Sequence, residues 1–167
     1  AVVSSIVFTL SDGRGNPLDT FNRKVVITGS QKAWKLHPDP QVDLCAMPIA
    51  SIVTLLRSQG FNPFYTAFDI TALPNDQQKK EFQSLEDIIM IGYPDGIWDS
   101  SNNKPIFRRG ITATHPNRDY MGKKEFLIDA ACFPGSSGSP VLIYNELGYF
   151  DGKNYLVGKR RMLLIGI

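Results

Sequence analysis

The sequence predicts an all-β protein with short helices only near its middle, and three observations support this class. Short apolar runs alternate with clusters of Gly, Pro, Asn and Asp along most of the 167 residues, as in strands joined by turns. Helical patterns are short and occur only around residues 52–56 and 76–85. The composition, 43% hydrophobic and 20% charged, is that of an ordinary globular protein.

The first part of the chain is expected to be rich in strands. Strands are predicted at residues 2–10, 22–28, 34–36 and 44–49, where apolar runs are bounded by turn residues. Apolar residues at helical spacing over 52–56 predict a helix, and Gly60 is a suitable stop for it. Residues 57–86 then form a connection that contains the second predicted helix.

The remainder of the chain, residues 87–167, is again expected to be rich in strands. They are predicted at residues 87–94, 109–113, 126–131, 141–144, 155–157 and 161–167. A turn at Asp151 and Gly152 precedes the last two of them.

Residues 134–140, Pro-Gly-Ser-Ser-Gly-Ser-Pro, carry the clearest chemical signal in the chain. Ser137 lies two residues after Gly135 and directly before Gly138, which predicts a tight turn. The N–H groups of Gly135 and Ser137 can then point at one spot and form an oxyanion hole beside a nucleophilic hydroxyl. The alternative is a Gly/Ser/Pro surface turn without chemistry, but the strand predicted directly behind it favours a catalytic loop.

Residues 133–141 resemble the nucleophile loop of chymotrypsin-like serine proteases, especially bacterial trypsin-like peptidase domains. The resemblance implies a double β-barrel, with residues 1–56 in the first barrel, 57–86 between the barrels and 87–167 in the second. It makes Ser137 the nucleophile. The α/β-hydrolase pattern Gly-x-Ser-x-Gly does not fit, because Ser139 stands where its second glycine is required.

Asp43 is the candidate for the triad aspartate that this resemblance implies. It stands at the head of an apolar run that is expected to form a short buried strand. It precedes Ser137 by 94 positions, against about 93 in chymotrypsin. Its role would be to hold the histidine in the right tautomer and to stabilise the imidazolium. The alternative is an acid that only caps a strand.

The general base is expected outside the given sequence. In chymotrypsin the histidine lies about 45 positions before the aspartate, which here falls just before Ala1. Both ends of the chain resemble interior segments of the family fold, so we expect its first and last strands to be missing here. His37 and His115 are the alternatives, but each lies beside proline in an expected surface turn, and neither matches the family position.

Two departures from trypsin-type enzymes bear on regulation and specificity. Ser136 replaces the aspartate that precedes the nucleophile in trypsin-type enzymes, so no zymogen switch of that kind is expected. Ala131, six residues before the nucleophile, would form the floor of the primary substrate pocket. Because it carries no carboxylate, a small or medium apolar side chain is the expected substrate residue.

The expected function is therefore that of a serine endopeptidase acting on peptides or proteins. Since the base contributes several powers of ten in rate, the given chain alone is expected to be nearly inactive. One alternative is a pseudo-protease that binds peptides or regulates a partner. Another is that a separate, nicked chain supplies the first strands. Attached domains of a larger bacterial protein also fit the resemblance.

Charge and hydropathy argue against other partners. The net charge is +2 with both signs mixed, which does not favour nucleic acid. Short basic groups such as Arg108–Arg109 and the run 159–161 are interpreted as solvated faces. No apolar run approaches the roughly 18 residues of a membrane span.

The cysteine pattern bears on compartment and cofactors. Cys45 and Cys132 fall in different barrels of the family fold and are expected to be buried free thiols. Without a disulfide framework, they point to a cytoplasmic protein. Neither a metal nor another cofactor is expected, because Cys and His show no ligand-type spacing.

Overall fold

A computed structural model describes residues 3–28 and 32–167, and its contacts divide the chain into two units. Unit 1 comprises Ala1–Thr66 with Ser100–Asn103, and unit 2 comprises Ala67–Asp99 with Lys104–Ile167. The first boundary, after Thr66, falls inside the segment 57–86 that was expected to connect two parts.

A long antiparallel ribbon forms the main part of unit 1. It consists of β1 (Val3–Ser11) and β2 (Pro17–Thr28), and β5 (Pro63–Phe64) pairs with the other edge of β1. The strand predicted at 22–28 is confirmed but begins five residues earlier, at Pro17. A register shift after Thr9 lets this extension pair with the end of β1.

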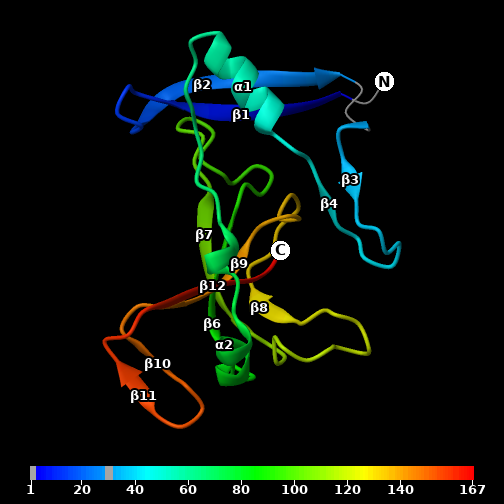
Figure 1. The fold of residues 1–167 in the computed structure, drawn as a ribbon, viewed down its shortest axis with the longest axis vertical. Helices are drawn as coiled ribbons and strands as arrows, with labels where there is room; N and C mark the ends of the chain where they lie inside the picture. Colours follow the sequence, from blue (N-terminus) through cyan, green and yellow to red (C-terminus); the bar gives the residue numbers. More distant parts are fainter. Residues whose placement is uncertain (1–2, 29–31) are drawn as a thin grey trace. The chain divides into compact units, whose positions relative to one another are not determined.

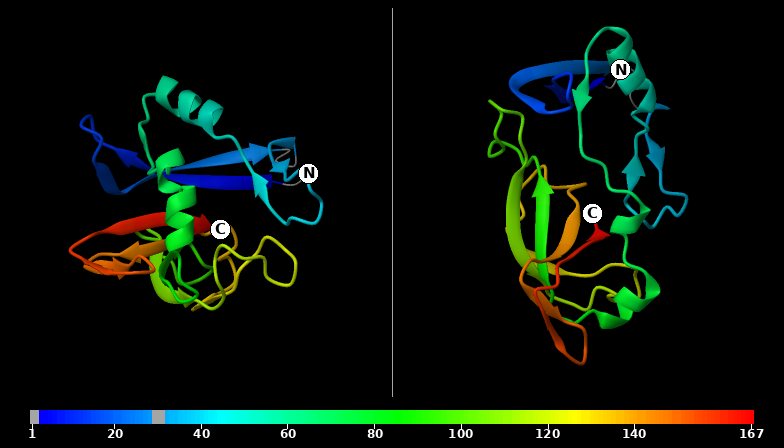
Figure 2. Two further views of the ribbon diagram at one scale, coloured as in Figure 1. Left: turned by 60° about the horizontal axis from the view of Figure 1, so that its bottom comes forward. Right: turned by 60° about the vertical axis from the view of Figure 1, so that its left-hand side comes forward.

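Helix α1 (Ala50–Ser58) lies across one face of this ribbon (Figures 1 and 2). Its Val53 and Leu56 are buried. Gly60 follows the helix with φ +82° and donates its N–H to the carbonyl of Arg57 at 3.0 Å. This left-handed residue is the usual end of a helix, so both the predicted helix and its stop are confirmed.

A short hairpin in unit 1 corrects one strand prediction. It joins β3 (Lys35–Leu36) to β4 (Cys45–Ala46). The prediction of a buried strand over residues 44–49 is wrong, because pairing stops at Ala46 and both β4 residues are exposed. Pro48 has no N–H to donate to a strand partner, and α1 begins two residues later.

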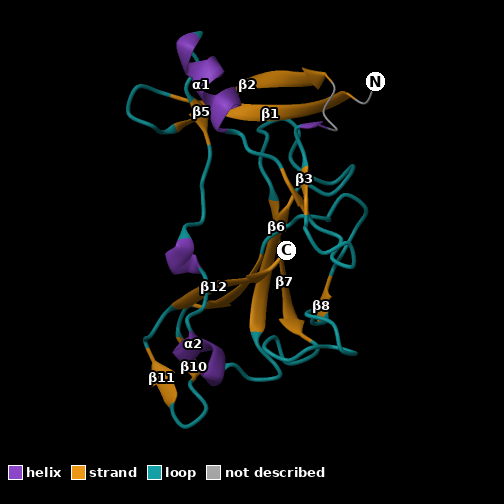
Figure 3. Cartoon of the chain, turned by 45° about the vertical axis from the view of Figure 1, so that its right-hand side comes forward, coloured by secondary structure: helices purple, strands orange, loops and turns teal. Residues whose placement is uncertain are grey.

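One antiparallel sheet organises unit 2, and Figure 3 shows most of its strands in orange around β6 and β7. Its strands are, in spatial order, β12 (Arg161–Gly166), β9 (Val141–Asn145), β6 (Asp87–Gly92), β7 (Ile106–Thr112) and β8 (Ile128–Ala130). The predicted strands at these places are thus confirmed, with shifted ends. The core on this sheet contains Phe82, Ile88, Met90, Val141, Ile143 and Leu163.

Shorter elements complete unit 2. They are η2 (Ile70–Ala72), α2 (Asp76–Glu81), β10 (Gly148–Phe150) and β11 (Tyr155–Val157). The helix predicted at 76–85 ends four residues early. Phe82 adopts an extended backbone, with ψ 138°, and places its side chain in the core at 5% exposure. Burial of this ring outweighs continuation of a polar helix.

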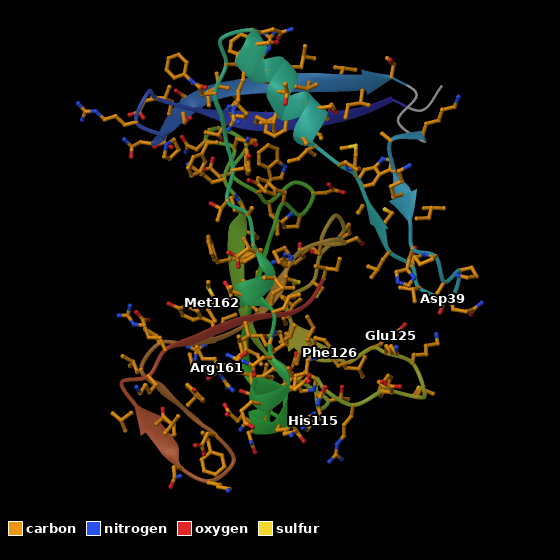
Figure 4. The ribbon with its side chains drawn as sticks, viewed as in Figure 1. Asp39, His115, Glu125, Phe126, Arg161 and Met162 are labelled. Atoms are coloured by element: carbon orange, nitrogen blue, oxygen red, sulfur yellow. The ribbon has the colours of Figure 1, made fainter. Side chains whose placement is uncertain are left out.

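A buried ion pair lies beneath the sheet of unit 2. Glu86 Oε2 and Arg161 Nη2 are 2.6 Å apart, and their side chains are 5% and 3% exposed. The prediction of a solvated basic run is therefore wrong for Arg161, which begins β12 (Figure 4). Asn145 Oδ1 accepts a further bond from its Nε at 2.9 Å. Burial raises the pKa of the Glu86 carboxyl above 4.5, although the Gln83 N–H and Arg161 oppose this shift.

Strands account for 39% of the described residues and helices for 12%, which agrees with the predicted all-β class. Among the described residues, the strands form no closed barrel. No helix in this part of the chain is both long enough and apolar enough to cross a membrane.

Candidate active site

Two consecutive β-turns form the loop between β8 and β9. Ser136 N–H closes the first turn on the carbonyl of Phe133 at 3.0 Å, and Ser139 N–H closes the second on Ser136 at 3.0 Å. Gly135 and Gly138 occupy the third positions, with φ +81° and +82°. A type II turn requires a positive φ at this position, which explains both glycines.

These turns leave the N–H groups of their central residues without a protein partner. In the described residues, Gly135, Ser137 and Gly138 donate no backbone hydrogen bond, whereas Ser136 and Ser139 both close turns. Ser137 is exposed, and its hydroxyl makes no hydrogen bond within the same part of the chain. The loop therefore combines an accessible hydroxyl with unpaired N–H groups, the types of group that stabilise an oxyanion.

The loop after β6 packs directly against Gly135. A Cβ atom on Gly135 would lie 2.8 Å from Asp95 Oδ1 and 2.9 Å from Asp95 N. The N–H of Asp95 also donates to the carbonyl of Pro134 at 2.9 Å. Gly135 is thus required for space as well as for its backbone angle.

Arg108 of β7 lies beneath the loop and is 6% exposed. Its Nη1 donates to Ser136 Oγ at 2.6 Å and to the carbonyl of Ala131 at 3.2 Å, and its Nη2 reaches Ser139 Oγ at 3.5 Å. The prediction of a solvated Arg108–Arg109 pair is wrong for Arg108. Consecutive strand residues face opposite sides, so only Arg109 is directed to solvent.

The electrostatic setting of Arg108 is unusual for a buried cation. No carboxylate of the described residues forms an ion pair with it. Its Nε is buried and has no hydrogen-bond partner there. Neutral oxygens of the loop therefore provide most of the compensation for its charge.

The sequence interpretation missed Arg108, although a usable signal was present. The predicted strand at 109–113 began three residues too late, because β7 runs over Ile106–Thr112 and so includes Arg108. When two consecutive arginines lie in one strand, their side chains point to opposite faces of the sheet, so one of them points inward. A buried arginine next to a polar loop is then a candidate structural cation.

Ala131 and the two cysteines are all exposed. Ala131 directly follows β8, and its carbonyl accepts the bond from Arg108. The prediction of buried thiols is wrong, because both Cys45 and Cys132 are exposed and free. Cys45 lies in the short β4, and Cys132 lies in the loop that precedes the two turns, so neither faces a core.

Asp43 and His37 belong to unit 1. Both lie in the loop between β3 and β4, on which Figure 4 labels Asp39, and both are exposed. His37 N–H donates to the carbonyl of Leu44 at 2.9 Å, and its Nδ1 accepts from Asp39 N–H at 3.1 Å. The imidazole of His37 is therefore engaged within its own turn.

The other histidine, His115, lies in unit 2 between β7 and β8 (Figure 4). Its Nδ1 accepts from the N–H of Asn117 at 3.1 Å. In residues 3–28 and 32–167, no group of His, Cys, Asp and Glu side chains could hold a metal ion.

Comparison with known proteins gives no relative for this chain. No protein-family model matches it, and neither a curated protein nor a solved structure matches it significantly. The functional interpretation therefore depends on the geometry of the loop and on the resemblance of its sequence.

Proposed function

We propose that this chain is most of a serine endopeptidase domain with the chymotrypsin-like double barrel. Ser137 attacks the carbonyl carbon of a peptide bond, and the N–H groups of Gly135 and Ser137 stabilise the resulting oxyanion. Asp43 orients a histidine that precedes Ala1 in the full-length protein. This histidine takes the proton of Ser137 and returns it to the leaving amine.

The observation that carries the proposal is that free N–H groups lie beside the exposed hydroxyl of Ser137 in a loop whose shape is fixed. The two turns engage the N–H groups of Ser136 and Ser139 and leave those of Gly135, Ser137 and Gly138 without a partner in the described residues. Free N–H groups at central positions are common to all β-turns, so their place beside Ser137 is what supports the proposal. The Cβ clash at Gly135 and the buried Arg108 further support a loop of defined shape.

Substrate choice follows from the residue beneath the expected pocket. Ala131 is small and uncharged, so the proposal includes cleavage after small or medium apolar residues rather than after Lys or Arg. A cytoplasmic location is also part of the proposal, since both cysteines are free thiols.

Labelling with a fluorophosphonate tests the proposal on the full-length protein, with intact mass as the readout. We expect a single adduct that Ser137→Ala abolishes. Ser84→Ala is the matched control, because Ser84 is another exposed serine of unit 2, and it should label like the wild type. A folded sample that gains no adduct would overturn the protease proposal and favour a pseudo-protease that binds peptides.

The isolated 167-residue chain provides the complementary measurement. If a histidine before Ala1 is the base, the isolated chain should label several powers of ten more slowly than the full-length protein. Equal rates would show that the base lies within residues 1–167. His37→Ala and His115→Ala would then identify it.

A further inference from the structure

We infer that Arg108 is the positioning residue of the Ser137 loop and that it holds the loop in its two-turn conformation without an activating cleavage. The effect of Arg108 on catalysis rests on the proposed function. Its effect on the order of the loop does not.

The hydroxyl of Ser136 connects Arg108 to the loop. It accepts one bond from Arg108 Nη1 at 2.6 Å and a second from the N–H of Phe133 at 3.2 Å. A serine oxygen has two lone pairs, so both are in use. Because Ser136 is the residue directly before Ser137, this junction fixes the backbone from which the nucleophile projects.

The guanidinium reaches both ends of the loop. The same Nη1 that holds Ser136 also holds the carbonyl of Ala131, while Nη2 reaches Ser139 Oγ at 3.5 Å. One planar group therefore contacts residues before and after Ser137. A flexible lysine amine, a single point charge, lacks this fork geometry.

The neighbouring strand leaves room for this arrangement. A Cβ atom on Gly92, the last residue of β6, would overlap Ser139 Oγ and lie 3.1 Å from Arg108 Nη2. The absence of a side chain at Gly92 thus lets the guanidinium and Ser139 occupy the same corner. The residues of this arrangement come from β6, β7 and the loop between β8 and β9, all of which belong to unit 2.

The charge of Arg108 is better explained by the loop than by packing. A buried cation without a carboxylate partner is costly, and an apolar side chain would fill the same space at lower cost. Arg108 is compensated by the oxygens of Ala131, Ser136 and Ser139. In trypsin-type enzymes an aspartate before the nucleophile holds the loop after cleavage. Here Ser136 bonds to a cation already present in the strand.

Hydrogen exchange and labelling kinetics test Arg108 with a matched neighbour. Arg108→Met is compared with Arg109→Met, whose side chain is 78% exposed and pairs with Asp87 at 3.1 Å. In Arg108→Met we expect amides of residues 131–140 to exchange at least about tenfold faster, whereas β6 and β9 stay protected. The maximal rate of fluorophosphonate inactivation should fall about a hundredfold with little change in inhibitor affinity. Arg109→Met should remain within about twofold of the wild type.

The outcomes separate the two proposals. If the loop loosens in Arg108→Met but the wild type never labels, the positioning role stands and the protease function fails. If the wild type labels and Arg108→Met exchanges and labels like Arg109→Met, the positioning role is wrong.

A second variant covers the case in which Arg108→Met unfolds. Ser136→Ala keeps Arg108 and removes only the hydroxyl that accepts bonds from Arg108 and from the N–H of Phe133. This change alone should therefore speed amide exchange in residues 131–140. In a double-mutant cycle, Ser136→Ala should add much less to Arg108→Lys than to the wild type, because the two residues act through one contact. Additive effects would overturn the inference.

Discussion

Gly92 shows how the absence of one side chain makes room for Arg108 and Ser139 beneath the Ser137 loop. It ends β6 with its Cα close to Ser139 and to the guanidinium of Arg108. Ser139 is 6% exposed, and its N–H closes the second turn of the loop, which holds its backbone in place. The space above Gly92 is therefore already filled.

We expect Gly92→Ala to destabilise the protein by about 1–3 kcal/mol, because the added methyl overpacks this corner. Gly13→Ala is the matched control, since nothing lies within 4 Å of a Cβ there and its φ is not in the left-handed region. That control should change the stability by less than about 1 kcal/mol. Urea unfolding of both variants provides the measurement, and equal midpoints would contradict the clash.

The sequence predicted the tight turns of the Ser137 loop and missed the arginine beneath them. The turns could be predicted because turn chemistry is local, and the positive φ of Gly135 follows from residues next to it in the chain. Arg108 is 28 positions from Ser136, and the bond between them depends on how β7 passes under the loop. The sequence gives no difference between Arg108 and Arg109, whereas β7 directs the first to the interior and the second to solvent.

At the scale of elements, two ion pairs made by neighbouring acidic residues at the start of β6 differ sharply in exposure. Glu86, just before β6, is buried against Arg161 of β12 at 2.6 Å. Asp87, the first residue of β6, pairs with Arg109 at 3.1 Å, and the two side chains are 47% and 78% exposed. A carboxylate–guanidinium pair therefore contributes differently to stability when it is buried and when it is exposed.

Arg161→Met should destabilise the protein by about 3–5 kcal/mol at neutral pH, because the carboxylate of Glu86 then stays buried without its cation. Arg109→Met, which breaks the exposed pair, should cost no more than about 1 kcal/mol. Chemical denaturation at pH 7 compares the two. A similar loss in both variants would mean that the buried pair contributes no more than the exposed one.

Element boundaries were predicted well where the chain itself supplies the signal. Gly60 ends α1 by its left-handed backbone, a property of one residue. The end of α2 could not be read in this way, because Phe82 leaves the helix in order to enter a core built by distant strands. Likewise, the exposure of β4 depends on its short pairing with β3 and not on its apolar sequence.

At the scale of the whole molecule, carboxylates with opposite pKa shifts contribute in opposite senses to how stability varies with pH. The pKa of Asp12, Asp69 and Asp151 is lowered from 3.8 by hydrogen bonds from neighbouring side chains and backbone N–H groups. Their contribution is present above that value and is lost as the pH falls through the lowered pKa. Burial raises the pKa of Glu86 above 4.5, so the folded state binds its proton more tightly than the unfolded state. Stability from this group therefore falls as the pH rises from 4.5 through the raised pKa.

We expect the unfolding midpoint to pass through a maximum at mildly acidic pH. Glu86→Gln should remove the decline above pH 4.5 and leave the loss at lower pH unchanged, because the aspartates are still present. Thermal unfolding between pH 3 and pH 7 provides the measurement. A wild-type midpoint that climbs steadily to pH 7 would contradict the assigned direction for Glu86.

The all-β class followed from the sequence because turn residues separate the apolar runs along the whole chain. The path of the chain between the two units did not follow. Residues 87–167 were expected to form the second part of the chain, yet Ser100–Asn103 belongs to unit 1. Asn103 is 9% exposed there, and its amide donates to Val7 O at 3.1 Å and to Thr9 Oγ1 at 3.2 Å.

The two units are therefore not two successive segments of the chain, because unit 1 is built from two separate stretches of sequence. The backbone passes from one to the other after residues 66, 99 and 103. A fragment of residues 1–66 alone would lack Ser100–Asn103, which belong to the same unit. It would therefore lack the buried side chain of Asn103, and the carbonyl of Val7 and the hydroxyl of Thr9 would lose the bonds that its amide donates. The first 66 residues should thus be less stable as a separate fragment than they are within the whole chain.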